Sequence, residues 1–317
     1  MPDRQAKASI SALAQQVRDF INQTRKQHAL RKDFRAWNQL CSSLDVIGDT
    51  ELAFDACAAA PNTEDAGAIY IQVYGVLQAL VLQQDAVLHL AEALGLRYEL
   101  DPLLKEVREV RNASIGHPTK RGGRARSHFI SRISMSRTGF QLMTVYPYPG
   151  PTEFKGVSLP ALIATQRSQL RAILTEVVIS LQREAEEHKA MFKGDSLAAA
   201  FPATTDYYFE KIFESIPSGR SLEYGRMHVR LLSEAVARFQ SKLVERSVAG
   251  AYDGVAYHLN LVGYPLKELD HYFTDPSLAH LNERDAQIFT QFTQGEIQIL
   301  RKMAADIDET YEVDGDA

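Results

Sequence analysis

The feature that most constrains the fold is an apolar segment, residues 64–94, in which nearly every side of the expected helix is apolar between residues 69 and 82. A helix that is hydrophobic all round is normally the buried central helix of a bundle. The stretch 69–82 is too short to span a bilayer and contains Gln72 and Gln78. We therefore expect a helical bundle around this segment, in a cytoplasmic protein that makes no membrane contact.

Local signals mark where this helix and the next one begin and end. Asn62 or Thr63 is a suitable N-terminal cap, and Gly95 follows the last apolar residue, where a C-terminal cap is expected. Asp101 followed by Pro102 predicts the start of a further helix, which continues to about residue 115. The two helices are thus expected to follow each other after a short connection.

The remaining pattern is mostly helical. Apolar spacing of three and four residues predicts helices over residues 9–44, 159–192, 205–215, 221–250 and 283–310, with a linker at 193–203. Residues 128–135 and 140–146 alternate around a glycine-containing connection, which predicts a β-hairpin. The expected fold class is therefore mainly α: a helical bundle with one inserted hairpin at about 128–146 and an additional C-terminal helical region. The expected regions are 1–60, 61–195 and 196–317.

Composition narrows the class of protein. The chain of 317 residues has 45% apolar residues, as ordinary soluble proteins do, and a formal net charge of −5. That charge argues against a nonspecific nucleic-acid coat protein, because such proteins are usually basic. The two cysteines, Cys41 and Cys57, fit a reducing compartment and are expected to be buried. The sequence has no Cys/His cluster with metal-ligand spacing and no signal-peptide pattern, so we expect no metal and no cofactor.

One segment concentrates the candidate chemistry. Residues 103–118 read LLKEVREVRNASIGHP, a charged amphipathic helix that carries Arg111 and Asn112 near its end and stops around Gly116, His117 and Pro118. Arginine presents a planar fork for phosphate oxygens, and histidine titrates near neutral pH. The pair therefore suits phosphate binding combined with proton transfer. The alternative is a helix C-terminus whose cations only complement the helix dipole.

The same spacing of arginine and histidine occurs twice more, at Arg121/His128 and Arg183/His188. Arg121/His128 joins a glycine-rich loop to the first expected strand, so its geometry is poorly fixed. Arg183/His188 lies in a run of glutamates on a long helix, where a solvated face with intrahelical ion pairs is expected. Both are interpreted as structural.

The apolar helix ending in LQQDA (residues 82–86) and the charged helix ending in RNASIGH (residues 111–117) together resemble the HEPN superfamily of small all-helical domains. The hallmark of that family is an arginine, a polar residue and, after a short gap, a histidine. Arg111, Asn112 and His117 match these positions. The resemblance covers about residues 64–192, and the hairpin and the C-terminal region depart from the plain four-helix pattern.

The resemblance implies a function. Many HEPN proteins are metal-independent endoribonucleases, often toxins or anti-phage effectors, whereas others have lost catalysis and only bind. The family typically dimerises so that two Arg–His pairs face each other in one cleft. By this resemblance Arg111, Asn112 and His117 are expected to be catalytic in a homodimer, and RNA products are expected to end in a 2′,3′-cyclic phosphate or 3′-phosphate and a 5′-hydroxyl.

Residues near the motif are candidates for holding the substrate. Arg108 lies one turn before Arg111 on the same helix face. The basic loop after the motif offers cations for RNA phosphates, with plain solubility as the alternative: Lys120, Arg121, Arg124 and Arg126. Gln83, Gln84 and Asp85 interrupt an apolar helix. Because buried polar groups need partners, these three are expected to brace Arg111 across the bundle or across a dimer interface.

The sequence thus predicts a ribonuclease of the HEPN type, a toxin or antiviral defence effector whose expected partners are an RNA substrate, a second copy of the chain and an antitoxin or regulatory protein. One alternative is a non-catalytic helical module that binds RNA, a nucleotide or a protein. Under it, Arg111 anchors an ion pair and His117 caps a helix. A further alternative is a regulatory subunit that acts through its C-terminal helices.

Overall fold

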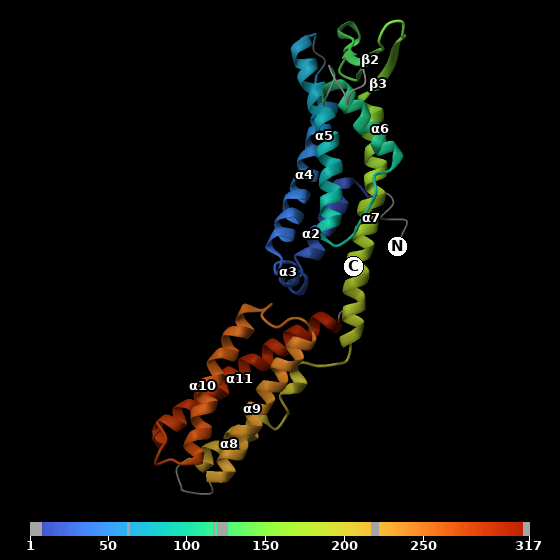
Figure 1. Ribbon diagram of the computed structural model, residues 1–317. Helices are drawn as coiled ribbons and strands as arrows, with labels where there is room; N and C mark the ends of the chain where they lie inside the picture. Colours follow the sequence, from blue (N-terminus) through green and yellow to red (C-terminus); the bar gives the residue numbers. More distant parts are fainter. Residues whose placement is uncertain (1–7, 62–63, 117, 119–125, 217–221, 313–317) are drawn as a thin grey trace. The chain divides into compact units, whose positions relative to one another are not determined.

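The computed structural model describes residues 8–61, 64–116, 118, 126–216 and 222–312. Its residues group into two compact units. Unit 1 comprises Met1–Gln23 and Leu30–Arg183, and unit 2 comprises Thr24–Ala29 and Glu184–Ala317. Both units are mainly helical, as predicted (Figure 1). The units divide inside one long helix, whereas the sequence suggested a boundary at 195/196.

Unit 1 is a bundle of long helices with a small sheet. Its helices are α2 (Ile10–Ile21), α4 (Phe34–Ala59), α5 (Ala66–Ala93), α6 (Pro102–Arg111) and α7 (Leu159–Phe192), of which α7 continues into unit 2. One core joins α2, α4, α5 and α7 through residues such as Leu13, Leu44, Leu90 and Leu174. Residues 1–60, expected as a region of their own, therefore contribute α2 and α4 to the same core as α5.

Residues 9–44 are mostly helical, as predicted, but they do not form one continuous helix. Three helices cover this stretch: α2, α3 (Thr24–Leu30) and the first part of α4. Ser9 caps α2 by accepting a hydrogen bond from the backbone N–H of Ala12. Asp33 starts α4 by accepting from the backbone N–H groups of Arg35 and Ala36. A mid-sequence cap of this kind ends one helix and begins another even where the apolar spacing continues.

The central apolar helix forms as predicted, as α5. Its N-terminal cap is Asp65, which accepts from the N–H of Gly67; Asn62 and Thr63 lie outside the described residues. Gly95 ends it with a φ of 78°, a left-handed conformation that glycine adopts freely. By length and composition α5 alone among the described helices could cross a membrane. It contacts α4 and α6 and buries Gln83 and Gln84, while 39% of its most apolar window is buried inside the structure.

The sheet is larger than the expected hairpin. It has three antiparallel strands in the order β1 (Ser127–Ile130), β2 (Gly139–Val145) and β3 (Thr152–Ser158). Strand β2 is as predicted, but residues 131–135 are not a strand and include a short 3-10 turn, Arg132–Ser134. Sequence reasoning missed β3 because most of its side chains are exposed on both faces, which leaves no alternation to read.

The sheet lies at the end of unit 1 where α4 ends and α7 begins (Figure 1). Phe140, Leu142 and Val157 from the sheet pack in one core with Phe54 of α4 and residues of α5. At residue 139 a side chain would collide with the carbonyl oxygen of Val157, so the pairing of β2 with β3 requires glycine there. The sheet therefore closes this end of the bundle.

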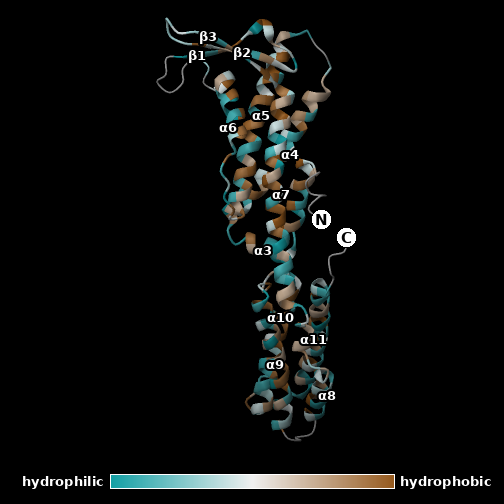
Figure 2. Ribbon diagram, turned by 90° about the vertical axis from the view of Figure 1, so that its right-hand side faces the viewer, coloured by the Kyte–Doolittle hydropathy of each residue, from teal (hydrophilic) through white to brown (hydrophobic). Residues whose placement is uncertain are grey.

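Unit 2 is helical throughout its described elements. The helices α8 (Thr205–Ser215), α9 (Leu222–Glu245) and α11 (Glu283–Glu312) agree with the prediction. Helix α10 (Asp253–Thr274) was missed, because Pro265 inside it reads as a helix breaker. Figure 2 shows hydrophobic and hydrophilic residues together along these helices, as amphipathic helices require. Their apolar faces form a separate core.

The two cysteines are free thiols and are half-buried rather than buried as expected. The sulfur of Cys57, near the end of α4, accepts a hydrogen bond of 2.9 Å from the Nε2 of Gln72 on α5. This contact is local to unit 1.

Candidate functional site

Helix α6 places the candidate arginines. Asp101 caps it by accepting a 2.7 Å hydrogen bond from the N–H of Leu103, and Pro102 occupies its first position, as predicted. Leu104, Val107 and Val110 are buried and fix which face of α6 meets the bundle. Arg108 and Arg111 consequently both reach across to α5, one turn apart.

The end of α6 differs from the expected helix. After Arg111 the chain makes one π-helical turn, Asn112–Gly116, in which Ala113 and Ser114 are buried. The hydroxyl of Ser114 is buried and has no hydrogen-bond partner among the described residues. Single π-helical turns are uncommon and frequently lie at functional sites. The turn ends one residue before His117, which lies outside the described residues.

Arg111 is held by two neutral amides. Its Nη2 and Nε donate to the Oε1 of Gln78 on α5 at 2.7 and 3.3 Å, and its Nη1 donates to the Oδ1 of Asn112 at 3.0 Å. Amide oxygens orient a guanidinium without cancelling its charge. Among the described residues no carboxylate pairs with the half-buried Arg111, and its orientation is fixed, which suits a group that must bind an anion.

The guanidinium of Arg111 lies directly against Gly116. A Cβ at position 116 would stand 2.9 Å from the Nη1 of Arg111 and 3.2 Å from the Oδ1 of Asn112. The missing side chain is what allows this close approach. The arginine therefore contacts the residue that immediately precedes His117 in the sequence.

Arg108 has a different environment. Its Nε donates to the Oε1 of Gln84 at 2.7 Å, and its Nη2 forms an ion pair with Asp85. Gln84 and Asp85 thus brace Arg108 within the chain. The sequence had suggested that they brace Arg111 across the bundle, which the structure does not bear out. The carboxylate of Asp85 offsets the charge of Arg108, so this arginine is better suited to fixing α6 on α5 than to binding phosphate.

Gln84 is one end of a buried chain of hydrogen bonds through the bundle. Its Nε2 donates to the Oε1 of Gln166 on α7 at 2.8 Å, and the Nε2 of Gln166 donates to the Oε1 of Gln83 at 2.8 Å. The Nε2 of Gln83 donates to Glu51 on α4 at 2.7 Å, and Glu51 pairs with Arg167 of α7. This chain joins α6, α5, α7 and α4, so the polar residues inside the bundle are satisfied by one another.

The described ends of the basic loop lie beside the π-helical turn. The backbone N–H of His128 in β1 donates to the carbonyl of Pro118 at 2.8 Å. Arg126 is half-buried, and its Nε has no hydrogen-bond partner among the described residues. Lys120, Arg121 and Arg124 lie outside the described residues. Strand β1, which follows the loop, thus lies against the π-helical turn at the end of α6.

The other two Arg–His pairs do not resemble the candidate site. His128 is buried, with its Nδ1 3.0 Å from the hydroxyl of Thr144 on the neighbouring strand. His188 is half-buried rather than solvated, and its Nε2 lies 3.0 Å from the carbonyl of Arg246. Glu184, in the same run of glutamates, pairs with Arg25 and Lys26 of α3 instead of forming intrahelical pairs. Both histidines serve the packing of their own unit.

Sequence reasoning missed Gln78, the residue that holds Arg111. Its signal was present, since Gln78 is one of two polar interruptions of the apolar stretch 69–82. Within the part of the chain that the structure describes, no group of three or more His, Cys, Asp or Glu side chains is arranged to hold a metal ion. No protein-family model, curated protein or solved structure matches the chain, so the site is interpreted from its own geometry.

Proposed function

We propose that the protein is a metal-independent endoribonuclease of the HEPN type, acting through Arg111, Asn112 and His117. One observation carries the proposal. Two neutral amides hold the guanidinium of Arg111 with its charge intact against Gly116, next to His117 in the chain. A purely structural arginine at a helix end is expected to pair with a carboxylate, as Arg108 does with Asp85.

The chemistry needs one cation and one titratable group. The imidazole of His117 accepts the proton of a ribose 2′-hydroxyl, whose oxygen attacks the adjacent phosphorus. Arg111 binds the phosphate oxygens, which gain negative charge in the transition state. The bond from phosphorus to the 5′-oxygen breaks, and that oxygen takes up a proton. The products carry a 2′,3′-cyclic phosphate and a 5′-hydroxyl, and no metal or cofactor takes part.

The surroundings of the site are assigned roles on the same basis. Lys120, Arg121, Arg124 and Arg126 bind the RNA backbone on either side of the cleaved phosphate. Arg108, Gln84 and Asp85 position α6 and do not contact RNA. This assignment moves Arg108 from substrate binding to a structural role, because its charge is already offset.

A second copy of the chain completes the proposed site. Ile71, Tyr74 and Leu82 share the face of α5 that carries Gln78, and they are 77%, 44% and 45% exposed. An exposed apolar stripe beside a polar site is typical of a protein interface. A homodimer through this face brings two Arg111 side chains toward one cleft. Leu82→Glu is expected to give a monomer by light scattering and to abolish cleavage.

The proposal assigns the protein a cytoplasmic role as a toxin or antiviral effector, restrained by an antitoxin or regulatory protein. The test compares RNA cleavage in EDTA by wild type, His117→Ala, Arg111→Gln and Gln78→Leu. Loss of the histidine is expected to lower the rate about 10²–10⁴-fold, and loss of the arginine about 10²–10³-fold. His89→Ala and Arg97→Gln, at exposed positions of the same unit, serve as matched controls and are expected to cleave normally.

Equal cleavage by wild type and by both His117→Ala and Arg111→Gln would contradict the proposal. If none of the proteins cleaves RNA, the non-catalytic binding module takes its place. That reading is tested by the affinity for RNA of wild type and Arg111→Gln.

A further inference from the structure

A separate pocket lies in unit 1, on the side of the bundle formed by α4 and α7. Its walls are the last turns of α4, the connection that leads into β2 and the first turns of α7. Its volume is about 600 Å³, within the range of about 300–1,000 Å³ that is usual for small-molecule sites. Of the residues given to the candidate ribonuclease site, none that the structure describes lines it.

The described residues that line the pocket include three arginines: Arg137, Arg167 and Arg171. Among the described residues that line it, none is acidic. The whole chain has more acidic than basic residues, 40 against 35. A lining whose charged residues are all arginines therefore differs from the charge balance of the chain as a whole. Because Arg167 is paired with Glu51 and Asp55 just behind the lining, the attraction of the pocket for an anion rests mainly on Arg171.

Two of the arginines are fixed in place. Arg167 donates to Asp55 at 2.8 Å and pairs with Glu51 at 2.9 Å, and its guanidinium lies 5.8 Å from the centre of the Phe54 ring. Arg137 donates through its Nη2 to the carbonyl of Cys57 at 3.1 Å, at the end of α4. Both guanidinium groups are thus oriented before any ligand arrives.

Arg171 is the open cation of the pocket. It lies one turn after Arg167 on α7, but unlike Arg167 it forms no ion pair within the described part of the chain. The Nε of Arg171 is buried and has no hydrogen-bond partner among the residues that the structure describes. A buried donor of this kind calls for a partner, which a bound oxyanion would supply.

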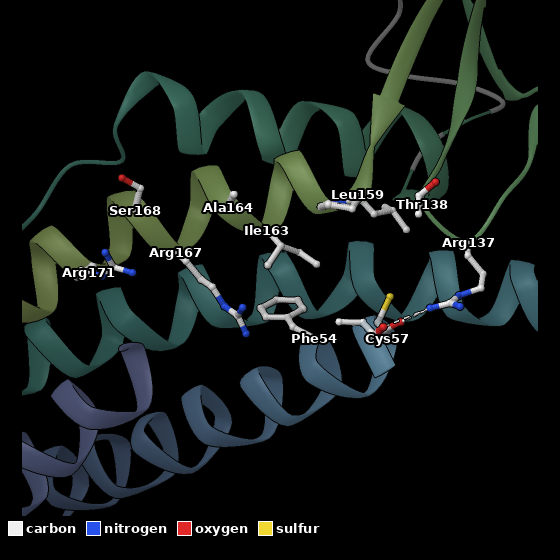
Figure 3. A pocket seen from close by; sticks show the side chains of 12 residues that line it. Phe54, Cys57, Arg137, Thr138, Leu159, Ile163, Ala164, Arg167, Ser168 and Arg171 are labelled. Atoms are coloured by element: carbon white, nitrogen blue, oxygen red, sulfur yellow. Dashed lines mark hydrogen bonds between the residues drawn. The ribbon is translucent and has the colours of Figure 1, made fainter. Parts of the chain in front are cut away.

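The space between the arginines is apolar. Figure 3 shows Arg167 and Arg171 toward one end of the pocket and Arg137 at the other, with Phe54, Ile163 and Leu159 between them. Phe54 and Leu159 belong to the core and are buried. An apolar floor with few polar groups selects a ligand with an apolar body, and the cations at the ends select its charge.

We propose that this pocket binds an organic anion with an apolar, ring-containing body and a carboxylate or phosphate group. The anionic group is bound by Arg171, because the charge of Arg167 is already offset by Glu51 and Asp55. The ring lies over Phe54 and Ile163. The site is independent of the ribonuclease proposal, since it uses other residues and requires no cleavage of RNA.

The test measures binding to the full chain by calorimetry with three probes: 1-naphthyl phosphate, 1-naphthoate and the neutral 1-naphthol. Both anions are expected to bind saturably, and the neutral probe at least about tenfold more weakly, because a charge-assisted hydrogen bond is worth about one to two decades in affinity. The ratio between phosphate and carboxylate identifies the preferred anionic group. Inorganic phosphate is expected to bind more weakly than 1-naphthyl phosphate, since it lacks the apolar body.

Variants separate the pocket from nonspecific association. Arg171→Gln is expected to weaken binding of both anions about tenfold to a hundredfold. Ala164→Trp fills the pocket without removing a charge and is expected to abolish binding. Arg183→Gln, at an exposed position further along α7, is the matched control and is expected to bind as wild type does.

Thermal melting of each variant establishes that it is folded, and Arg171→Gln carries the test if Ala164→Trp does not fold. The proposal is overturned if neither anion binds saturably, if 1-naphthol binds as tightly as the anions, or if a folded Arg171→Gln keeps the wild-type affinity. Binding that survives in folded Ala164→Trp would also overturn it, by placing the anion outside the pocket.

Discussion

At the scale of single residues, the protein distinguishes two arginines one turn apart by their partners. Arg108 meets a carboxylate, whereas Arg111 meets the amides of Gln78 and Asn112. The sequence indicates which residue types are present but not which turn of α5 faces which turn of α6. That register depends on how two helices cross, so Gln84 was assigned to the wrong arginine and Gln78 was overlooked. The assignment of Arg111, Asn112 and His117 as the motif, in contrast, rests on their order in the sequence and remains a prediction.

Gly116→Ala tests the positioning of Arg111 directly. The new Cβ would meet the ends of two side chains, at 2.9 Å from Arg111 and 3.2 Å from Asn112, so the guanidinium shifts while the backbone remains. Misplacing a reacting group by about 1 Å costs about 10²-fold in rate. We expect RNA cleavage to fall by about that factor, measured as initial rates, with an unchanged melting temperature.

Gly48→Ala on α4 is the matched control, because a Cβ there meets no atom within 4 Å. It is expected to leave cleavage unchanged and to raise stability by up to about 1 kcal/mol, as a glycine replaced within a helix does. A Gly116→Ala protein that cleaves at the wild-type rate would show that the close approach of Arg111 is not needed.

At the scale of elements, the strongest periodic and capping signals were reliable. Helix α7 runs over residues 159–192 as predicted, and Asp101 with Pro102 starts α6. Prediction failed where a local side chain overrides the apolar spacing, as Asp33 does before α4, or where an element carries little pattern, as in the exposed strand β3. It also failed at α10, which tolerates Pro265 because packing in unit 2 stabilises the helix.

The hydrogen-bonded chain through Gln166 is expected to be essential to the bundle. Gln166 is fully buried and bonds the carbonyl of Leu80 as well as Gln83 and Gln84. Gln166→Leu leaves these buried groups without partners, at a cost of about 1–3 kcal/mol each, partly relieved by local rearrangement. We expect the free energy of unfolding of unit 1 to fall by about 2–4 kcal/mol in urea denaturation.

Gln169→Leu, at a half-exposed position one turn along the same helix, is the control and is expected to change stability by less than about 0.5 kcal/mol. Equal effects of the two substitutions would mean that the buried chain contributes nothing specific. If Gln166→Leu leaves the free energy of unfolding unchanged, the buried chain of hydrogen bonds likewise contributes nothing specific to stability.

At the scale of the whole molecule, each unit has a core of its own, and unit 2 carries a pH-dependent contribution to stability. Burial, together with the charge of Arg25, lowers the pKa of His188 below its ordinary value of 6.5. The neighbouring Glu184 and the hydrogen bond to the Arg246 carbonyl act in the opposite direction but do not reverse the shift. The folded unit therefore holds His188 neutral.

In the unfolded chain His188 binds a proton below about pH 6.5. Because the unfolded state then binds more protons than the folded state, the free energy of unfolding falls as the pH is lowered through 6.5 toward the pKa of the folded state. His188→Gln keeps an amide donor for the Arg246 carbonyl and cannot titrate. We expect urea unfolding of this variant to depend less on pH between about 5 and 6.5 than that of wild type.

Carboxylates with lowered pKa affect a different pH range. Burial raises the pKa of Asp308, but hydrogen bonds from the backbone N–H groups of Ala198 and Leu197 and from Ser196 lower it more. Its contribution is lost only as the pH falls below its ordinary value of 3.8. Identical pH profiles of wild type and His188→Gln between about 5 and 6.5 would therefore rule out His188 as the origin of the change.

The central claim is that Arg111 and His117 cleave RNA by internal attack without a metal. The most direct measurement identifies the ends of the products that wild type and His117→Ala leave on RNA in EDTA. The account predicts 2′,3′-cyclic phosphate and 5′-hydroxyl ends from wild type only, and no cleavage where the 2′-hydroxyl at the cut is replaced by hydrogen. Products with 5′-phosphate ends, or cleavage that requires a divalent cation, would contradict it.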